Sequence, residues 1–588
     1  MNRPHTETPA APLVRRGGAP LFIGVATLLL FAGVVVRLAV LKFYSIDELT
    51  YAHAAWSVGQ GLVPFRDFFF HHTPLLLQLG GAVLGILDDD PANIAHLRLL
   101  MLPVFALICW LSYLLNREWG TVAALLAPVF VLATPLVATM ATEYRPDPLA
   151  FALALAAVVL LRASVGTAGF RAAGAGALLA AGIWASEKVA VYGLAFLLAW
   201  LSDLRKGGPE SSRLTLRPRA FFLGGAAMAS VAAAYLSLSS SWPAFWRWGI
   251  RWPLVHQEHY PGFPWPTYFT PFVRESWWIL ALALAGAAAS ARALGSRDRV
   301  RSRPDTLLLL LLATTFTSFA AQKSAYPYSL VPFAVLAAIF AARGAAAVYD
   351  LVGSRIRGLG AARALRAGLV LALAAVLSLA WLELRERGAD DNSHQHEVLA
   401  RLHHLTTPDD PVYDNSGGYV ARPHVSFFFF TDATVRRLLP DLLVREMPAA
   451  ILRSGCTVFM PDIRFPSLPS ELRSFVLTHF QPYDGDIYLW GQRYDAGDPG
   501  AAGTLSTRAE FLAVRDAVYF VEPGAVVSRG SLAIDGRRLD RPEIRLAAGI
   551  HRLEYSGPDR QFYLLWLPRD GNTWTPRPGL PVRFSRLF

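Results

Sequence analysis

The sequence contains little charge for its length. Of its 588 residues, 17% are Asp, Glu, Lys or Arg, whereas 54% are hydrophobic. Soluble globular proteins carry about a quarter charged residues, so this composition excludes a soluble globule. The chain is therefore predicted to be an integral membrane protein.

Cysteine is almost absent as well. The two cysteines are Cys109, inside an apolar run, and Cys456, in the C-terminal part. We therefore expect no structural disulfide. No Gly-rich loop follows a strand pattern, so the sequence also lacks the signature of a soluble nucleotide-binding fold.

Long apolar runs fill the first two thirds of the chain. Most are about 17 to 23 residues long, the length that an α-helix needs to cross a hydrocarbon core of about 30 Å. The first run lacks a small-residue cleavage site, so we expect a retained helix and not a signal peptide. Eleven membrane-spanning helices are predicted, at residues 20–41, 97–115, 120–141, 148–164, 172–186, 188–203, 220–240, 277–293, 305–321, 327–342 and 367–384.

Basic residues are concentrated in alternate connections between these helices. If the N-terminal tail is cytoplasmic, the connections predicted to be cytoplasmic follow the positive-inside rule. Their basic residues are Arg205, Lys206, Arg213, Arg217, Arg219, Arg292, Arg297, Arg299, Arg301, Arg303, Arg343, Arg355, Arg357, Arg363 and Arg366. The net charge of +11 is then a topology signal, and nucleic-acid binding is not needed to explain it. We expect a multi-pass protein of a bacterial inner membrane.

The last two hundred residues contain no apolar run of spanning length. An odd number of spans places them on the periplasmic or extracellular side. Helical patterns mixed with short β-rich runs predict an α/β unit at 391–495, and short strands with turn signals predict a β-sandwich at 505–588. The predicted organisation is a cytoplasmic tail at 1–19, a membrane domain at 20–390, and these two extracytoplasmic units.

Ionisable residues gather at the predicted outer ends of the helices. Charges at or inside the apolar boundary are costly, so they tend to mark function or a pairing partner. Together they predict an acid-and-base pocket at the membrane surface. The residues are Asp47, Glu48, Arg66, Asp67, His71, His72, Glu143, Arg145, Asp147, Glu187, Lys188 and Lys323.

Several of these residues also have a purely structural explanation. Ser45 and Glu48 fit a capping box at the start of a helix. Asp147 followed by Pro148 fits an N-cap with proline in the first helical position. The lysines could extend from helix ends toward lipid headgroups. The functional prediction therefore rests on the joint location of the set.

The order of these features resembles that of a known superfamily. An apolar first helix leads to "DE" at Asp47, then to "GLVPFRD" at 61–67, then to "HHTPL" from His71. A short outer loop with Asp147 precedes the fourth span. This set is similar to the GT-C superfamily of membrane glycosyltransferases, in the branch of protein O-mannosyltransferases and lipid A aminoarabinose transferases.

The resemblance covers residues 20–390 and implies a reaction. The donor would be a sugar on polyprenyl phosphate in the bilayer, and the sugar would pass to an acceptor hydroxyl with inversion. The acceptor would be a lipid, a glycan or a protein. A hydroxyl is a poor nucleophile, so it needs a carboxylate general base. In the family this is the Asp of the first outer loop, which matches Asp47, while Glu48 would orient the acceptor or the loop.

The leaving lipid phosphate needs cationic or hydrogen-bonding partners. Aminoarabinose transferases have a Lys before "P-P-L", and "HHTPL" places His72 at that position with His71 beside it. Histidine is only partly charged at neutral pH. The other candidate cations are Arg66, Arg145, Lys188 and Lys323, and the remaining polar candidates for donor or acceptor binding are Asp67 and Glu143.

Asp147 matches the second-loop Asp of the family, which lies in the active site and sometimes near a divalent metal. Glu143 and Asp147 would form an i, i+4 carboxylate pair in a helix. Pro146 and Pro148 argue against a regular helix there. The sequence itself therefore indicates no cofactor, and a divalent metal stays an open alternative.

Aromatic residues crowd the loop 242–278. They fit an aromatic belt in the membrane interface, or a cover over donor or acceptor. Tyr326 and Tyr328, at the start of the tenth span, are predicted to line a lipid groove. The β-sandwich fits either an inert lid or protein-contact module, or a carbohydrate-associated one.

Two other functions fit a charged pocket on a polytopic protein. One is a transporter or flippase of lipid-linked sugars, but such proteins usually show paired halves and sites near the midplane. The other is a polysaccharide polymerase or ligase, which usually relies on Arg-rich outer loops. A carboxylate pair directly after the first helix favours the glycosyltransferase.

Overall fold

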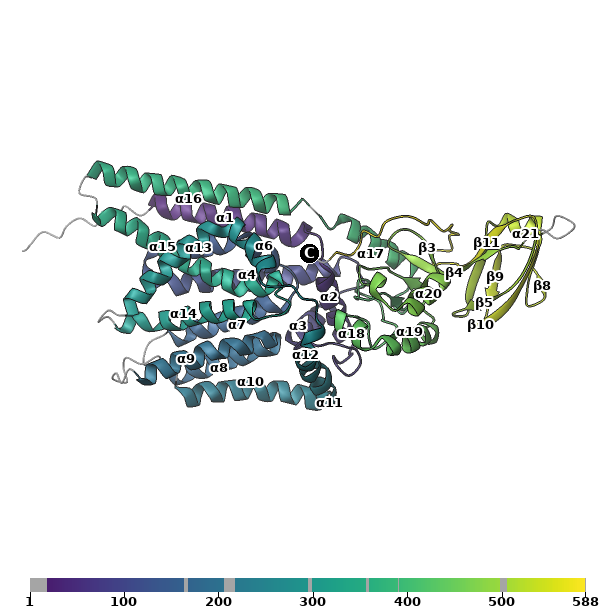
Figure 1. The fold of residues 1–588 in the computed structure, drawn as a ribbon, viewed down its shortest axis with the longest axis horizontal. Helices are drawn as coiled ribbons and strands as arrows, with labels where there is room; N and C mark the ends of the chain where they lie inside the picture. The colour runs from purple at the N-terminus through teal and green to yellow at the C-terminus, as the bar shows by residue number, and fades with distance from the viewer. Residues whose placement is uncertain are drawn as a thin grey trace, which may run out of the picture.

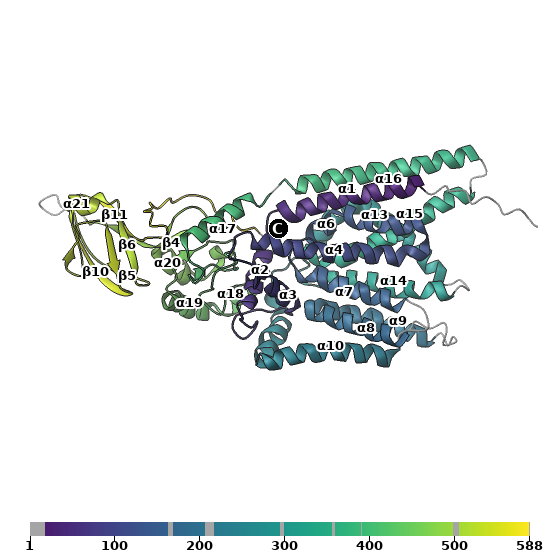
Figure 2. The same cartoon turned by 180° about the vertical axis from the view of Figure 1, so that it is seen from behind.

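The computed structural model describes residues 18–162, 168–205, 217–294, 299–355, 359–389, 391–497 and 505–586. A bundle of long helices forms one part of the molecule, and the C-terminal region covers one end of it (Figure 1). We call this the capped end and the opposite one the open end. The same arrangement is seen from behind, with the β-rich layers farthest from the bundle (Figure 2).

Helices overlap all eleven segments that the sequence predicts. The larger ones are α1 (Gly18–Leu41), α4 (Asn93–Asn116), α5 (Thr121–Ala133), α6 (Pro135–Met140), α7 (Pro146–Leu161), α8 (Ala168–Ala185), α9 (Tyr192–Arg205), α10 (Pro218–Leu238), α13 (Pro266–Leu294), α14 (Arg299–Ala320), α15 (Val331–Arg355) and α16 (Leu359–Arg387). In the described part, six helices are long and apolar enough to cross a membrane, and five more apolar helices are shorter. The chain is a multi-pass membrane protein, and eleven crossings remain a prediction.

Glycines allow two helix pairs of the bundle to touch. A Cβ at Gly286 of α13 would overlap the carbonyl oxygen of Phe340 in α15, and Gly344 is the reciprocal contact. Gly176 and Gly224 form the equivalent contact between α8 and α10. Lipid tails are as apolar as leucine, so close backbone packing through small residues replaces the hydrophobic effect between membrane helices.

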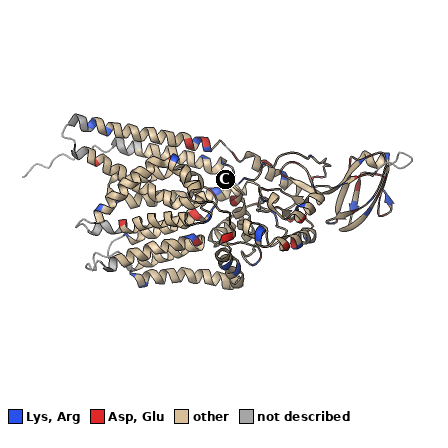
Figure 3. Cartoon of the chain, viewed as in Figure 1, with Lys and Arg blue, Asp and Glu red and all other residues tan. Residues whose placement is uncertain are grey.

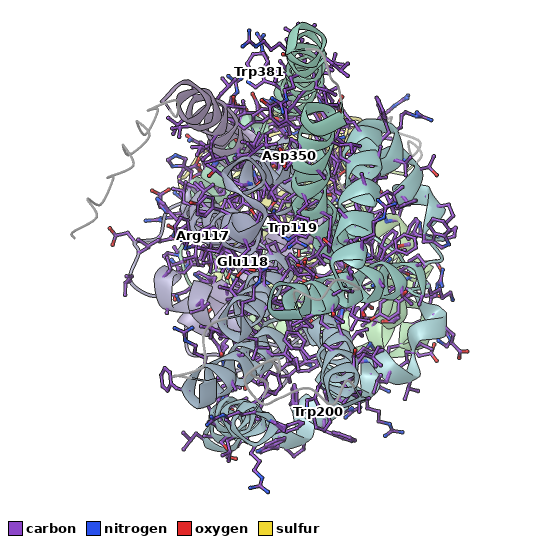
Figure 4. The ribbon with its side chains drawn as sticks, turned by 90° about the vertical axis from the view of Figure 1, so that its left-hand side faces the viewer. Arg117, Glu118, Trp119, Trp200, Asp350 and Trp381 are labelled. Carbon is purple, nitrogen blue, oxygen red and sulfur yellow. The ribbon has the colours of Figure 1, made fainter. Side chains whose placement is uncertain are left out.

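Charged residues are scarce in the middle of the bundle and gather at its two ends (Figure 3). Figure 4 looks onto the open end, where Glu118 and Trp119 lie near the centre of the face. Arg343, counted above as a loop charge, is instead fully buried in α15. It donates to Asp305 at 2.9 Å and Asn116 at 2.7 Å, and its guanidinium lies 5.0 Å from the Trp119 ring. Arg343 therefore ties helices together and is not free to interact with headgroups.

The C-terminal region contains an α/β unit and two sheets, and the first of these sheets begins inside that unit. Its elements are α17 (Ser393–Leu405), β1 (Val412–Tyr413), α18 (Ala433–Leu438), α19 (Pro440–Ser454), β2 (Val458–Phe459), α20 (Ser470–His479), β3 (Phe480–Pro482), β4 (Tyr488–Asp495), β5 (Leu505–Ala513), β6 (Ala517–Glu522), α21 (Ala525–Arg529), β7 (Ser531–Ile534), β8 (Arg537–Arg538), β9 (Glu543–Leu546), β10 (Gly549–Gly557) and β11 (Gln561–Trp566). One sheet has the order β1-β2-β4-β11-β6-β9, with β3 also on β4, and the other has the order β5-β10-β7-β8.

Strand β4 belongs to both parts of the C-terminal region. Its first residues pair with β2 and β3, and its later residues, from Gly491 onward, pair with β11. The chain continues from β4 into the strands of the sandwich, and the last of them, β11, returns to pair with β4. Strand β4 is therefore shared by the two parts, and the Arg515–Asp410 ion pair and the bond from the Arg569 N–H to the Leu405 carbonyl add further contacts between them.

The α/β unit is hydrogen-bonded to the segment that follows α1. This segment contains α2 (Ile46–Gly59) and α3 (Leu75–Leu84). The Gln395 amide bonds both the N–H and the C=O of Tyr44, at 2.7 and 3.0 Å. Phe69 N–H donates to Phe427 at 2.7 Å, and Thr50 donates to a carbonyl of the unit at 2.7 Å. These bonds hold side chains of the α/β unit close to the start of α2.

Candidate active site

The start of α2 separates two adjacent carboxylates. The Ser45 hydroxyl accepts from the N–H of Glu48 at 3.4 Å, so the predicted N-cap is confirmed. The Glu48 side chain does not complete the capping box. Arg98 of α4 donates to both its oxygens at 2.5 Å, and the N–H of Tyr144 donates at 3.0 Å. Glu48 is fully buried, so it orders the loop and does not face an acceptor.

Asp47 points the other way and stays accessible. Its side chain is 30% exposed. The Arg145 guanidinium donates to Oδ2 at 3.3 Å from both terminal nitrogens, and Arg464 of the α/β unit donates to Oδ1 at 3.5 Å. Charge-assisted bonds of this kind are usually about 2.7 to 2.9 Å. Asp47 therefore lies between two guanidinium groups that hold it loosely.

The strong partner of Arg145 is Glu143, whose Oε2 accepts from Nε at 2.6 Å. Lys42, at the end of α1, pairs with the other oxygen of Glu143. Burial opposes the charge of this carboxylate, but Lys42 and Arg145 outweigh it and hold its pKa at about 2. Glu143 therefore stays ionised. It holds the Arg145 guanidinium so that the two terminal nitrogens of Arg145 are directed at Asp47.

Lys188 lies beside Arg145. Its Nζ donates to Asp147 Oδ1 at 2.9 Å. The Arg145 guanidinium and the Lys188 ammonium lie 4.4 and 4.5 Å from the centre of the Tyr328 ring, and Tyr326 stacks on that ring at 5.4 Å. The aromatic face attracts both cations. Two positive charges are thereby held next to Asp47.

Asp147 is not an N-cap, which corrects the structural explanation considered above. Helix α7 begins at Pro146, and Arg145 is its N-cap. Asp147 is therefore the second helical residue, where a negative charge is favoured by the helix dipole. Glu143 lies outside the helix, as the two prolines predicted.

The two histidines are in a different electrostatic environment. His72 Nδ1 and Glu187 Oε1 are 2.9 Å apart. Burial and the neighbouring His72 lower the pKa of His71 to about 4. His71 is consequently neutral at physiological pH and brings no charge to a phosphate. Burial opposes the charge of Glu187, but His72 more than offsets it and lowers the pKa of Glu187 to about 2.

Three of the predicted site residues are engaged elsewhere. Arg66 binds Asp67 through two contacts of 2.8 Å and donates to the Ser239 carbonyl at 2.7 Å. Lys323 donates to the carbonyl of Glu258. These bonds tie the connections that follow α10 and α14 to neighbouring loops. Within the described part of the chain, none of the three residues forms a hydrogen bond or ion pair with Asp47.

The aromatic loop is divided between two environments. It contains α11 (Trp242–Ala244) and α12 (Trp252–Val255). Trp248 and Trp252 are buried and pack edge-on against Phe69. Trp246 is 63% exposed. Trp248 and Trp252 also contact Phe427 and Thr434 of the α/β unit, so one part of the loop joins that unit to the bundle, and Trp246 faces outward.

Two residues of the α/β unit belong to the site and were not predicted. Arg464 is held by the Asn415 carbonyl at 3.1 Å and lies 5.0 Å from the centre of the Phe430 ring. Asp432, at the N-cap of α18, lies with Oδ2 3.9 Å from His71 Nδ1. The contacts of Arg464 with Asp47 and of Asp432 with His71 join segments more than 300 residues apart, and nothing in the local sequence predicts them. Arg98 did have a signal, because a lone arginine in an apolar run needs a partner.

The candidate metal ligand Asp147 is already paired with a cation. Asp147 is paired with Lys188, and the described residues contain no group of three or more His, Cys, Asp or Glu side chains that could hold a metal ion.

A large apolar groove lies elsewhere in the bundle. It has a volume of about 1440 Å³ and lies among α1, α5, α13, α15 and α16, with Phe31, Leu125, Trp278 and Leu377 in its walls. Its lining includes neither Tyr326 nor Tyr328. Those two tyrosines belong to the polar site.

The fold is similar to that of two kinds of solved membrane enzyme. ArnT from Cupriavidus metallidurans bound to undecaprenyl phosphate matches with a TM-score of 0.52 and 15% identity, over 80% of this chain and 97% of that one. The apo state of the same ArnT matches with a TM-score of 0.55 and 14% identity, over the same shares of the two chains. The oligosaccharyltransferase AglB from Archaeoglobus fulgidus, in complex with an inhibitory peptide and a dolichol-phosphate, matches with a TM-score of 0.51 and 11% identity. The match covers 83% of this chain and 74% of AglB.

At these identities the likeness concerns the fold. The chain has the GT-C fold of these proteins, and the fold expected from the sequence is confirmed. No protein-family model and no curated protein sequence matches the chain.

Proposed function

We propose that this protein is an inverting membrane glycosyltransferase that moves a sugar from polyprenyl phosphate to an acceptor hydroxyl. The observation that carries the proposal is Asp47, a partly exposed carboxylate loosely held between two guanidinium groups, at the capped end of a GT-C bundle. Bound undecaprenyl phosphate and dolichol-phosphate in ArnT and AglB support a lipid-phosphate carrier. The capped end then faces the periplasm or the cell exterior.

In the proposed reaction Asp47 accepts the proton of the acceptor hydroxyl. The hydroxyl oxygen attacks the anomeric carbon, and the bond from that carbon to the phosphate oxygen breaks. A single displacement inverts the anomeric centre. The electron pair leaves with the phosphate, so polyprenyl phosphate is the second product, and its new charge is stabilised by Arg145, Lys188 and Arg464.

The length of the contacts suggests how the donor activates the base. Two guanidinium groups hold the Asp47 carboxylate. A donor phosphate competes for the same cations, and the contacts of 3.3 and 3.5 Å are weaker than the 2.6 Å bond that keeps Arg145 on Glu143. Donor binding would therefore free Asp47 when the acceptor needs it.

The test uses full-length protein in nanodiscs with radiolabelled undecaprenyl-phosphate hexoses and pentoses, and a membrane extract as acceptor. We expect transfer from one donor, with NMR of the product showing the opposite anomeric configuration. A retained configuration would overturn the single displacement. Movement of a lipid-linked sugar between vesicle leaflets without transfer from any donor would instead establish a transporter.

A further inference from the structure

Two buried polar atoms face one another across the junction of bundle and α/β unit. His71 precedes α3, and Asp432 precedes α18, which lies beside α2 and α3 in both views (Figures 1 and 2). The residues are 6% and 8% exposed. Neither His71 Nδ1 nor Asp432 Oδ2 has a hydrogen-bond partner among the described residues. Buried polar atoms without partners are rare, because each costs about 1 to 3 kcal/mol.

Their separation suits one shared partner. The two atoms are 3.9 Å apart, which is too far for a direct hydrogen bond. An oxygen about 2.8 Å from each would make two good hydrogen bonds. Asp432 is fixed for this purpose, since its other oxygen accepts from the N–H of Val435 at 2.7 Å and the hydroxyl of Thr434 at 2.6 Å.

The chemistry of the pair selects a hydroxyl. An ionised carboxylate only accepts, so the partner must donate to Asp432. A neutral imidazole can donate through Nδ1, so the same oxygen can accept from His71. A hydroxyl does both at once. A phosphate cannot donate, and it would be repelled by Asp432 and by Glu187, whose buried Oε2 is likewise without a partner in the described part.

The pair also lies next to the reacting groups. The His71 ring stacks on Phe430, with centroids 5.4 Å apart and planes at 21°. The guanidinium of Arg464 lies over the same Phe430 ring and reaches Asp47. One aromatic side chain therefore connects the hydroxyl-binding pair to the proposed base.

We propose that His71 and Asp432 bind one hydroxyl of a sugar ring, carried by either donor or acceptor. The inference rests on the proposed function, since a sugar must enter this site. It makes the α/β unit a direct part of sugar selection. A sugar lacking that hydroxyl would leave both atoms unpaired and bind more weakly.

Two variants remove the site without removing its structural roles. Asp432→Asn keeps the oxygen that caps α18 and replaces Oδ2 with an amide nitrogen. His71→Phe keeps a ring against Phe430 and removes Nδ1. Asp441→Asn, an exposed residue in the first turn of α19, is the matched control.

The measurement compares the binding of undecaprenyl phosphate with that of undecaprenyl-phosphate hexoses and pentoses, in nanodiscs. The hydrogen bond to the Asp432 carboxylate is charge-assisted, so we expect Asp432→Asn to weaken the binding of a glycosylated lipid at least about tenfold. The bond from the neutral His71 ring is weaker, so we expect His71→Phe to weaken that binding about two- to tenfold. Undecaprenyl phosphate without a sugar should bind as in wild type. An unchanged glycolipid Kd with a raised acceptor KM would assign the hydroxyl to the acceptor sugar.

Several results would overturn the proposal. The first is wild-type protein that binds no glycosylated lipid better than undecaprenyl phosphate, together with an acceptor KM unchanged in both variants. The second is an equal loss of undecaprenyl phosphate binding, which would mean general damage. Variants that behave like Asp441→Asn in all assays would show that the pair binds only water. A sugar-dependent Kd without transfer would uphold the site while the proposed enzyme fails.

Discussion

Replacing Arg464 with glutamine is expected to weaken binding of the lipid phosphate while leaving the fold intact. The side chain is 11% exposed, so its charge is poorly screened. It belongs to the α/β unit, yet its guanidinium contacts Asp47 of α2. Glutamine keeps much of the length and one donor group, and it removes the charge.

The magnitude follows from the bond that is lost. A hydrogen bond to a charged group contributes about 1.5 to 3 kcal/mol, which is about a 10- to 150-fold change in Kd. We therefore expect undecaprenyl phosphate to bind at least about tenfold more weakly in nanodiscs, by titration or thermal shift. Arg445→Gln, at a guanidinium that is 74% exposed and paired with Glu446, should bind as wild type does.

Unchanged affinity in Arg464→Gln would refute the reasoning. Arg464 would then only pack on Phe430, and Arg145 and Lys188 would bind the phosphate.

Three further predictions follow from buried groups. Glu48→Ala leaves Arg98 buried and unpaired, so it should destabilise the protein by about 3 to 5 kcal/mol, whereas Arg537→Ala, on an exposed strand, should leave the melting temperature unchanged. Gly286→Leu should lower the folded yield because its side chain would overlap α15; normal yield and melting would contradict the packing. The folded-state pKa of His71 is about 4, which is below its unfolded value. The stability that depends on neutral His71 is therefore fully present above about pH 6.5, and it is lost as the pH falls toward 4. At pH 5 the loss is about 2 kcal/mol, and His71→Phe should show a smaller fall in melting temperature between pH 7 and pH 5.

The sequence predicted best what depends on local pattern. Apolar length located the helices, and Ser45 located the start of α2. The start of α7 was misplaced by two residues because both Pro146 and Pro148 fit the first turn of a helix. Glu48 looked like a catalytic partner of Asp47, since adjacent residues cannot be told apart by spacing, yet α2 turns one toward Arg98 and the other toward the site.

The part of the site that sequence reasoning missed is contributed by tertiary contacts. Arg464 and Asp432 reach the bundle because hydrogen bonds to Tyr44, Thr50 and Phe69 dock the α/β unit on the segment that follows α1. Conversely, Arg66 and Lys323 lie in connections predicted to face the same side as Asp47, but their side chains bond to nearby loops. Topology placed residues at one end of the bundle, and it could not tell which of them converge.

The most direct measurement of the central claim is transfer by Asp47→Asn and Asp47→Glu beside wild type, with undecaprenyl phosphate binding measured on the same samples. A general base contributes about 10²- to 10⁴-fold. We expect the Asn variant to lose at least about 100-fold in rate while it still binds the lipid, and the Glu variant to recover part of the rate. Transfer within a few fold of wild type in Asp47→Asn would contradict the assignment of Asp47 as the base.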